Sequence, residues 1–377
     1  MKEKSLLLFL GISLSISLFA NGTKTVFVSS PGTLYSLLTA HEIDSISNLT
    51  ITGTIDARDF VILRDSLQVL DSLDLSGATI EAFNGAGGTT TDVETYLANE
   101  IPNSAFSGHK RFKSIILPTT TTSISDYAFY YCDSLTSFTI PTTVTTIGYG
   151  SFELCSSMRS IIIPPSVTDL GPYAFYYCDS LASVSLSPLL THINKSTFED
   201  CRKLSQITIP SSIKVIGENA FSDCYALSSV KIPSSVDSIL GNAFYDCLGL
   251  RSITVPSTVK YLGESAFSYC RSLQSFDLPT SISAISNSLF NYCDSLKSIS
   301  IPLNIKTIGE SAFYDCTSLK AITIPTSVDT IGESAFDYCR SLQSVTIPSS
   351  VTYIGGYAFE GCDSIQSRKL AINRNVY

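Results

Sequence analysis

Residues 342–362 read LQSVTIPSSVTYIGGYAFEGC, and variants of this stretch fill most of the chain. Written from cysteine, the unit is C-x-x-L-x-x-[IVF]-x-[ILV]-P-x-x-[VI]-x-x-[IL]-G-x-x-[AS]-F-x-x, with a period of 23 residues. Phenylalanine keeps this step without a break from Phe106 to Phe359. A fixed period of about 20 to 29 residues with regularly spaced aliphatic positions predicts a solenoid, in which each coil buries its apolar side chains against its neighbours.

Each coil is expected to begin with a short strand. In the quoted stretch apolar and hydroxyl residues alternate, so Val345 and Ile347 should point inward while Ser344 and Thr346 point outward. Pro348 should end the strand because it has no N–H to donate to a ladder.

The second half of the coil should turn back toward the core. Val351 and Ile354 predict a second, shorter inward-facing segment, and Gly355 is expected to let the chain turn sharply. Ala358-Phe359 then predicts a tight helical or 3₁₀ turn. With neighbouring strands parallel and about 4.8 Å apart, eleven coils would extend on the order of 50 Å.

All eleven cysteines of the chain belong to this series. Eleven is an odd number, and the cysteine position lies between buried aliphatic positions, where a free thiol behaves as a small hydrophobe. We therefore predict a buried and mostly reduced column, although an exporting compartment would permit disulfides. Because there is no C-x-x-C pair or Cys/His cluster, no metal site is expected. The members are Cys132, Cys155, Cys178, Cys201, Cys224, Cys247, Cys270, Cys293, Cys316, Cys339 and Cys362.

Residues 1–22 have the features of a secretory signal peptide. Two lysines within Met1–Lys4 precede an apolar run, 5–19, which is interrupted by serines and followed by the small residues Ala20 and Gly22. The run is shorter than the roughly 17 to 25 apolar residues of a membrane anchor. The sequence therefore predicts a secreted or cell-surface, extracytoplasmic protein without a transmembrane segment.

The remaining chain divides into a diverged N-terminal cap (23–100), the regular repeats (101–367) and a C-terminal tail (368–377). Terminal repeats are expected to be atypical because their outer face meets water.

Within the cap, Leu49-Thr50-Ile51 lies 24 residues before Leu73-Asp74-Leu75, which predicts one earlier coil. Residues 56–66 predict a helix with Asp56 at its N-cap. A second helix is expected within 33–40, and 84–91 should form a flexible loop.

Composition argues against several functions. With 24 Lys+Arg against 33 Asp+Glu the net charge is −9, and no basic run is present, so nucleic acid is not expected as a partner. The three histidines, His41, His109 and His192, are far apart, and no G-x-S-x-G, P-loop or H-E-x-x-H motif occurs. We expect no enzyme activity, and no catalytic, cofactor-binding or metal residues.

The segments Leu-x-x-Ile-x-Ile-Pro, Val-x-x-Ile-Gly and Ala-Phe-x-x-Cys, as they stand between Leu319 and Cys339, resemble the repeats of BspA-like (Treponema-type) leucine-rich repeat surface proteins. The resemblance covers residues 101–365, with Asn194 and Ser286 replacing the turn glycine. It implies an α/β solenoid, dominated by β-structure, with a parallel sheet of about eleven regular 23-residue coils behind a diverged leucine-rich repeat cap. It also implies an exported or cell-surface protein that binds other molecules, and adhesion is the usual proposal.

The outward positions indicate where binding could occur. The strand face is mostly serine and threonine, whereas the two positions after phenylalanine are rich in tyrosine, which offers large, stiff contact area with a polar tip. The alternative is that these rings only pack along the solenoid edge. The candidate ligand-binding edge comprises Tyr130, Tyr131, Tyr176, Tyr177, Tyr245, Tyr269, Tyr292, Tyr314 and Tyr338.

Extracellular or host proteins are the expected partners of this edge. A second hypothesis is glycan capture for nutrient uptake, in which the rings would stack on sugars. A third hypothesis is that the protein is a self-associating structural component of the envelope. None of the three hypotheses implies a cofactor.

Overall fold

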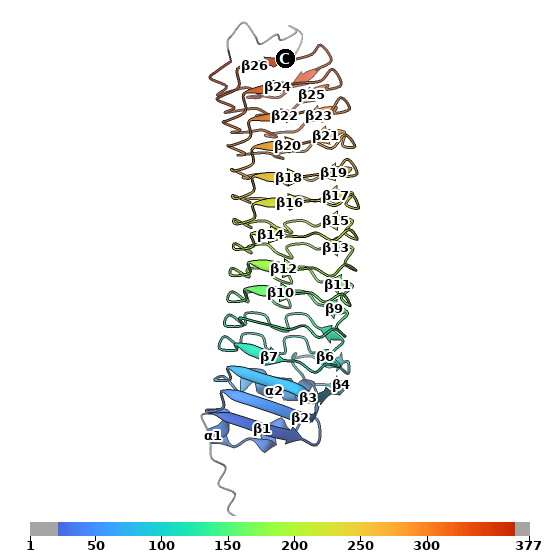
Figure 1. Ribbon diagram of the computed structural model, residues 1–377, viewed down its shortest axis with the longest axis vertical. Coiled ribbons are helices and arrows are strands. Elements are labelled where there is room, and N and C mark those ends of the chain that lie inside the picture. The colour runs from blue at the N-terminus through green and yellow to red at the C-terminus, as the bar shows by residue number, and fades with distance from the viewer. Residues whose placement is uncertain (1–21, 366–377) are drawn as a thin grey trace, which may run out of the picture.

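Two ladders of very short parallel strands run through the repeats and hold the coils together, and the first of them continues into the longer strands of the N-terminal end (Figure 1). The computed structural model describes residues 22–365, so the predicted leader (apart from Gly22) and the predicted tail lie outside the described residues. Partners in neighbouring coils are 23 residues apart, as in Ser160↔Ser183 and Ile308↔Ile331. The solenoid predicted from the repeat is confirmed.

The first strand ladder contains the segments that precede the proline position, and its sheet orders are β1-β2-β3-β7, β10-β12-β14, β16-β18 and β20-β22-β24-β26. Its repeat strands are β7 (Ser114–Ile116), β10 (Ser160–Ile162), β12 (Ser183–Ser185), β14 (Gln206–Ile207), β16 (Ser229–Lys231), β18 (Ser252–Thr254), β20 (Ser275–Asp277), β22 (Ser298–Ser300), β24 (Ala321–Thr323) and β26 (Ser344–Thr346).

The second strand ladder contains the segments before the glycine position, in sheets β11-β9-β8-β6, β13-β15-β17-β19 and β21-β23-β25-β27. Its strands are β6 (Glu100–Ile101), β8 (Ser123–Ile124), β9 (Thr146–Ile147), β11 (Asp169–Leu170), β13 (His192–Ile193), β15 (Val215–Ile216), β17 (Ser238–Ile239), β19 (Tyr261–Leu262), β21 (Ala284–Ile285), β23 (Thr307–Ile308), β25 (Thr330–Ile331) and β27 (Tyr353–Ile354).

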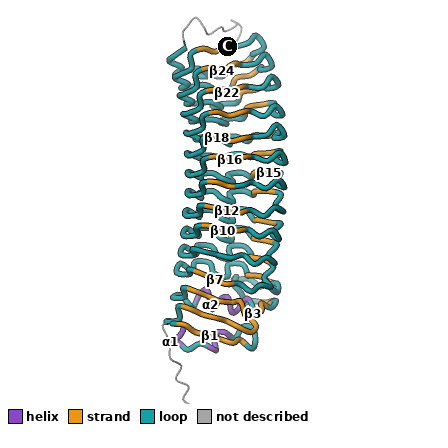
Figure 2. The backbone as a smooth tube through the Cα atoms, viewed as in Figure 1, coloured by secondary structure: helices purple, strands orange, loops and turns teal. Residues whose placement is uncertain are grey.

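The N-terminal end contains longer elements, and in Figure 2 the helices are confined to it. As expected, Leu49 pairs with Leu73, and Asp56 caps the predicted helix by accepting from the N–H of Arg58. The elements are β1 (Thr23–Val28), η1 (Leu34–Leu37), α1 (Ala40–Ile43), β2 (Asn48–Ile55), α2 (Ala57–Asp65), β3 (Ser72–Ile80), β4 (Phe83–Gly85) and β5 (Glu94–Tyr96).

Two local expectations for the cap need correction. The helix expected within 33–40 is a single 3₁₀ turn, η1, and the α-helix α1 begins only at Ala40. The loop expected over 84–91 starts inside a strand, because Asn84 and Gly85 belong to β4, which pairs antiparallel with β5.

Stacked phenylalanines form the centre of the solenoid. Neighbouring rings from Phe106 to Phe359 lie nearly parallel, with centroids 5.2 to 6.0 Å apart, within the range of offset-stacked pairs. The cysteines are free, and each thiol donates to the carbonyl of a phenylalanine in the preceding coil, as Cys224 Sγ does to Phe198 O at 3.2 Å. His109 occupies the cysteine position of the first coil, where it is buried against the carbonyl of Leu67.

The turn around phenylalanine differs from the predicted one. It is a series of hydrogen-bonded turns and not a helix, and two residues per coil adopt the left-handed conformation, two positions before and two after phenylalanine. The glycine of the repeat is required for another reason: a Cβ on Gly332 would lie 2.5 Å from the backbone nitrogen of Glu310 in the preceding coil. Where Asn194 replaces this glycine, its side-chain amide donates to the carbonyl of Leu170.

Candidate functional site

Five of the nine candidate tyrosines occupy the left-handed position two residues after phenylalanine, and the other four directly follow phenylalanine. Tyr269 and Tyr292 have φ of 60° and 56°, and each backbone N–H donates to a carbonyl of the next coil. The same conformation recurs in this column from coil to coil, so side chains that are 23 residues apart lie above one another. We call the edge of the solenoid that these turns form the turn edge. It is therefore a regular, hydrogen-bonded surface and not a mobile loop.

Five of the nine predicted tyrosines form one continuous row, which we call the C-terminal tyrosine ladder: Tyr245, Tyr269, Tyr292, Tyr314 and Tyr338. Consecutive ring centroids are 5.3, 4.6, 5.4 and 5.7 Å apart. The rings are half-buried, and Tyr338 is the most exposed at 37%. Each ring is thus held by its neighbours and remains partly exposed.

The other four predicted tyrosines belong to a second group, the N-terminal tyrosine cluster. Three tyrosines that the sequence reading left out complete it, with centroid distances of 4.6 to 6.3 Å between neighbouring rings. The cluster consists of Tyr127, Tyr130, Tyr131, Tyr149, Tyr173, Tyr176 and Tyr177. The added residues occupy other positions of the repeat, so only the turn geometry could place them here.

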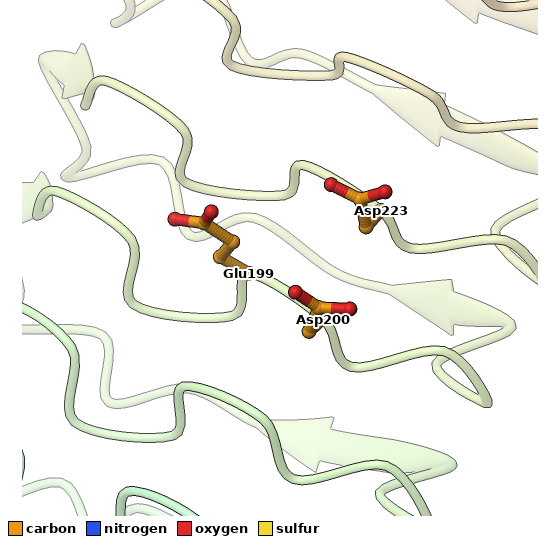
Figure 3. Close-up of side chains that lie close together, drawn as sticks. All are labelled: Glu199, Asp200 and Asp223. Carbon is orange, nitrogen blue, oxygen red and sulfur yellow. The ribbon is translucent and has the colours of Figure 1, made fainter.

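Carboxylates separate the two tyrosine groups. Glu199, Asp200 and Asp223 each place one oxygen within 4.8 Å of the others, with Asp223 on the coil after Asp200 (Figure 3). Carboxylate oxygens are suitable ligands for hard cations. Arg202 already pairs with Asp200 at 2.8 Å, however, and Tyr225 donates to Asp223. The sequence analysis did not predict this cluster. It could have been found from the repeat, because acids replace tyrosine there at the same repeat positions.

A shallow pocket of about 270 Å³ opens beside these acids, lined by Glu199, Asn219, Ser222, Asp223, Asn242 and Tyr245. Burial raises the pKa of Glu199, and the charges of Asp200 and Asp223 add to this effect. The pKa of Asp246, one coil further on, is raised to about 6 by burial and by Asp223. The middle of the edge is therefore acidic and sensitive to protonation near neutral pH.

Arginines cover part of the aromatic surface. The guanidinium of Arg271 lies 5.6 and 5.9 Å from the ring centroids of Tyr269 and Tyr292, and Arg340 lies 5.5 Å from that of Tyr338. These are cation–π distances, so the arginines occupy ring faces that a sugar would need for stacking. Burial also raises the pKa of Tyr314 to about 12, so this hydroxyl remains a proton donor at neutral pH.

None of the helices within residues 22–365 has the length and apolar character needed to cross a membrane.

Comparison with known proteins gives a consistent result. The sequence profile described as "BspA type Leucine rich repeat region" matches in six copies, over residues 99–228, 215–339 and 306–376. A leucine-rich repeat protein from Bacteroides ovatus is 24% identical, with 85% of this chain and 82% of that chain covered and a TM-score of 0.63. One from Eubacterium ventriosum is 22% identical, with 94% and 93% covered and a TM-score of 0.57. No curated protein matches the chain.

Proposed function

The chain belongs to the BspA-type leucine-rich repeat family, and we propose that it is an exported recognition scaffold, secreted or at the cell surface. In this proposal it binds a protein partner along its tyrosine edge and has no catalytic activity of its own. The C-terminal tyrosine ladder is the observation that carries this proposal. Five partly exposed rings in a row offer one continuous aromatic contact surface.

The chemistry of the edge supports a protein partner. Tyrosine and arginine are the residues most enriched among the dominant contacts of protein interfaces, and both are present here in fixed positions. Tyr292 is held between Tyr269 and Tyr314, and Arg271 lies against it. Such pre-packed side chains lose little conformational entropy on binding, which favours affinity.

Glycan capture at this edge is less well supported. A sugar stacks on an open ring face, whereas Tyr269 and Tyr292 stack on each other. Arg271 lies over both of these rings, and Arg340 lies over the ring of Tyr338. Tyrosine combines an apolar ring with a polar hydroxyl group, which suits the polar and apolar mixture of a protein surface.

The test is a binding screen of the mature chain against extracellular matrix proteins, followed by a triple variant of the ladder. Tyr269→Asn, Tyr292→Asn and Tyr338→Asn remove three rings but keep a residue type that tolerates positive φ, as the aspartates elsewhere in this column do. Loss of three interface aromatics should weaken a protein hit by at least about 100-fold.

Tyr261→Thr with Tyr353→Thr is the matched control. These tyrosines are 52% and 54% exposed on the second strand ladder, where threonine occurs at equivalent positions such as Thr330. The control should bind within about twofold of the unmodified chain. Equal affinity of the ladder variant and the unmodified chain would refute the assignment to this edge.

A further inference from the structure

A column of cations lies where the strands of the first ladder begin. Five residues directly precede β7, β10, β18, β22 and β24, and they are Lys113, Arg159, Arg251, Lys297 and Lys320. Backbone hydrogen bonds stack this position from coil to coil: Lys297 N–H donates to Gln274 O at 3.1 Å, and Lys320 N–H to Lys297 O at 3.2 Å. The residues, far apart in sequence, therefore form one stripe along the solenoid axis, which we call the basic stripe.

The charge of the stripe is uniform. No acid occupies this column between Lys113 and Gln343, and its other members are Thr136, Ala182, Ser205, Ser228, Gln274 and Gln343. Such segregation is notable in a chain with a net charge of −9. The acidic excess must lie on other faces, among them the turn edge with Asp200 and Asp223.

The charged groups of the basic stripe are also exposed and mostly unpaired. All five side chains are exposed, and among residues 22–365 only Lys113 has an ion-pair partner within 4 Å, namely Asp71 at 3.0 Å. By contrast, Arg202 and Arg271 on the turn edge are paired with aspartates. The unpaired cations Arg251, Lys297 and Lys320 lie within three coils, about 14 Å, and create a local positive potential there. Acids further away than about 8 Å are screened at physiological salt and reduce this potential little.

A column of hydroxyl groups adjoins the stripe. Serine follows four of the five cations, as in Lys113-Ser114 and Arg251-Ser252, and the second outward strand position is mostly Ser or Thr. Ile116 and Ile162 are exposed exceptions, and Asp277 in β20 is the one acid at the outward positions of the repeat strands. Together the two columns present cations and hydroxyls along roughly 40 Å of the axis, at about 4.8 Å per coil.

We propose that the basic stripe and the adjoining serine column bind a linear anionic polysaccharide that lies along the solenoid axis. The cations would pair with carboxylate or sulfate groups, and the serines would exchange hydrogen bonds with sugar hydroxyls. An acidic protein is a poorer fit, because the face lacks the aromatic anchors on which protein interfaces depend. This site is separate from the tyrosine edge and stands independently of its function.

Two matched triple variants test the proposal. Arg251→Ser, Lys297→Ser and Lys320→Ser place in the stripe a residue that the column already contains at Ser205 and Ser228. The control, Lys214→Ser, Lys260→Ser and Lys306→Ser, removes the same charge from exposed positions of the second strand ladder, where Ser283 and the acids Asp237 and Asp329 also occur. Affinities for immobilised heparin, alginate and neutral dextran would be measured between 50 and about 300 mM salt.

We expect the unmodified chain to bind heparin or alginate, or both, in a salt-dependent manner, and dextran not at all. The stripe variant should lose about tenfold or more in affinity, and the control should stay within about threefold. Asp277→Thr, which removes the acid from this face, should increase the affinity. The tyrosine variant should bind as the unmodified chain does.

Three results would overturn the proposal: no binding to either anionic polysaccharide at 50 mM salt, equal losses in the two triple variants, or unchanged binding when Asp277 is replaced. Displacement by poly-glutamate at equal charge concentration would show that charge alone is recognised and would refute the sugar assignment. Heparin binding alone would identify sulfate as the anion, and alginate binding alone would identify carboxylate.

Discussion

At the scale of single residues, the repeat has two backbone requirements, a residue without Cβ and a residue with positive φ. One glycine usually meets both, but here they fall on different positions. The glycine position needs a residue without Cβ because adjacent coils touch there, as at Gly332. The positions of positive φ are filled mostly by tyrosine, serine, asparagine and aspartate, for example Ser311 with φ of 51°, and only in a few coils by glycine, as at Gly150. A non-glycine residue in this conformation costs roughly 1 to 2 kcal/mol.

Two substitutions should therefore have opposite effects. Gly332→Ala would place a Cβ 2.5 Å from the backbone of Glu310 and should destabilise the fold by about 1 to 3 kcal/mol. Ser311→Gly relieves the strain at φ 51° and, after the extra chain entropy of glycine, should be neutral or stabilising by up to about 1 kcal/mol. Urea denaturation midpoints measure both effects; a lower midpoint for Ser311→Gly would contradict this account.

Protonation of Asp246 should link stability to pH. Its pKa rises to about 6 in the folded chain, against about 3.9 when unfolded, because burial and Asp223 disfavour the charged form. The folded state thus binds this proton more tightly. The stabilisation of the folded state by this proton is complete below about pH 4 and is lost as the pH rises through about 6.

Asp246→Asn should remove this dependence. Asparagine cannot ionise and tolerates the positive φ of 52°, so the variant should be more stable than the unmodified chain at pH 7.5, by about 1 kcal/mol after allowance for solvent screening. At pH 4 the two chains should unfold at the same midpoint. Equal midpoints at both pH values would exclude a role for this carboxyl group.

At the scale of the element, the cysteine column should be chemically inert. Ten of the eleven thiols are buried and each donates a hydrogen bond, and burial raises their pKa so that little thiolate forms. Cys362 is only partly buried, and its pKa is raised to about 11. Iodoacetamide at pH 8, followed by mass spectrometry, should therefore modify Cys362 slowly and the others only after unfolding. Rapid labelling of several cysteines would disprove the buried ladder.

The period of 23 was enough to predict the first strand ladder, the inward residues and the column of thiols, because side chains at equal repeat positions must stack. The second inward-facing segment of each coil was expected, but not that these segments form a strand ladder of their own. The period could not predict which different positions meet. Tyr149 joins Tyr127 and Tyr173, and Glu199 approaches Asp223, through turns whose left-handed residues are mostly not glycine, although Gly150 beside Tyr149 is an exception. The basic stripe was hidden for a related reason, since cations 23, 46 or 92 residues apart form no basic run.

At the scale of the whole molecule, each coil contacts only its two neighbours, so stability should be a sum over coils and interfaces. Strand partners are always 23 residues apart in the repeats, as in Ser275↔Ser298 and Thr307↔Thr330. Removal of one complete coil should then leave every remaining inward residue facing inward. Removal of 22 residues, one fewer than a complete coil, should turn the side chains at the junction to the opposite face of the strand.

Deletion of residues 300–322 joins Ile299 to Thr323 and regenerates the repeat sequence Ser-Ile-Thr-Ile-Pro. The shortened chain should fold, retain a cooperative transition with a lower midpoint, and have a maximum dimension reduced by about 5 Å in solution scattering. Deletion of 300–321 instead leaves Ile299 beside Ile322 and moves one aliphatic side chain outward. This control should unfold locally and expose thiols of the adjacent coils to iodoacetamide. If both deletions behaved alike, the register of the first strand ladder would not determine the fold.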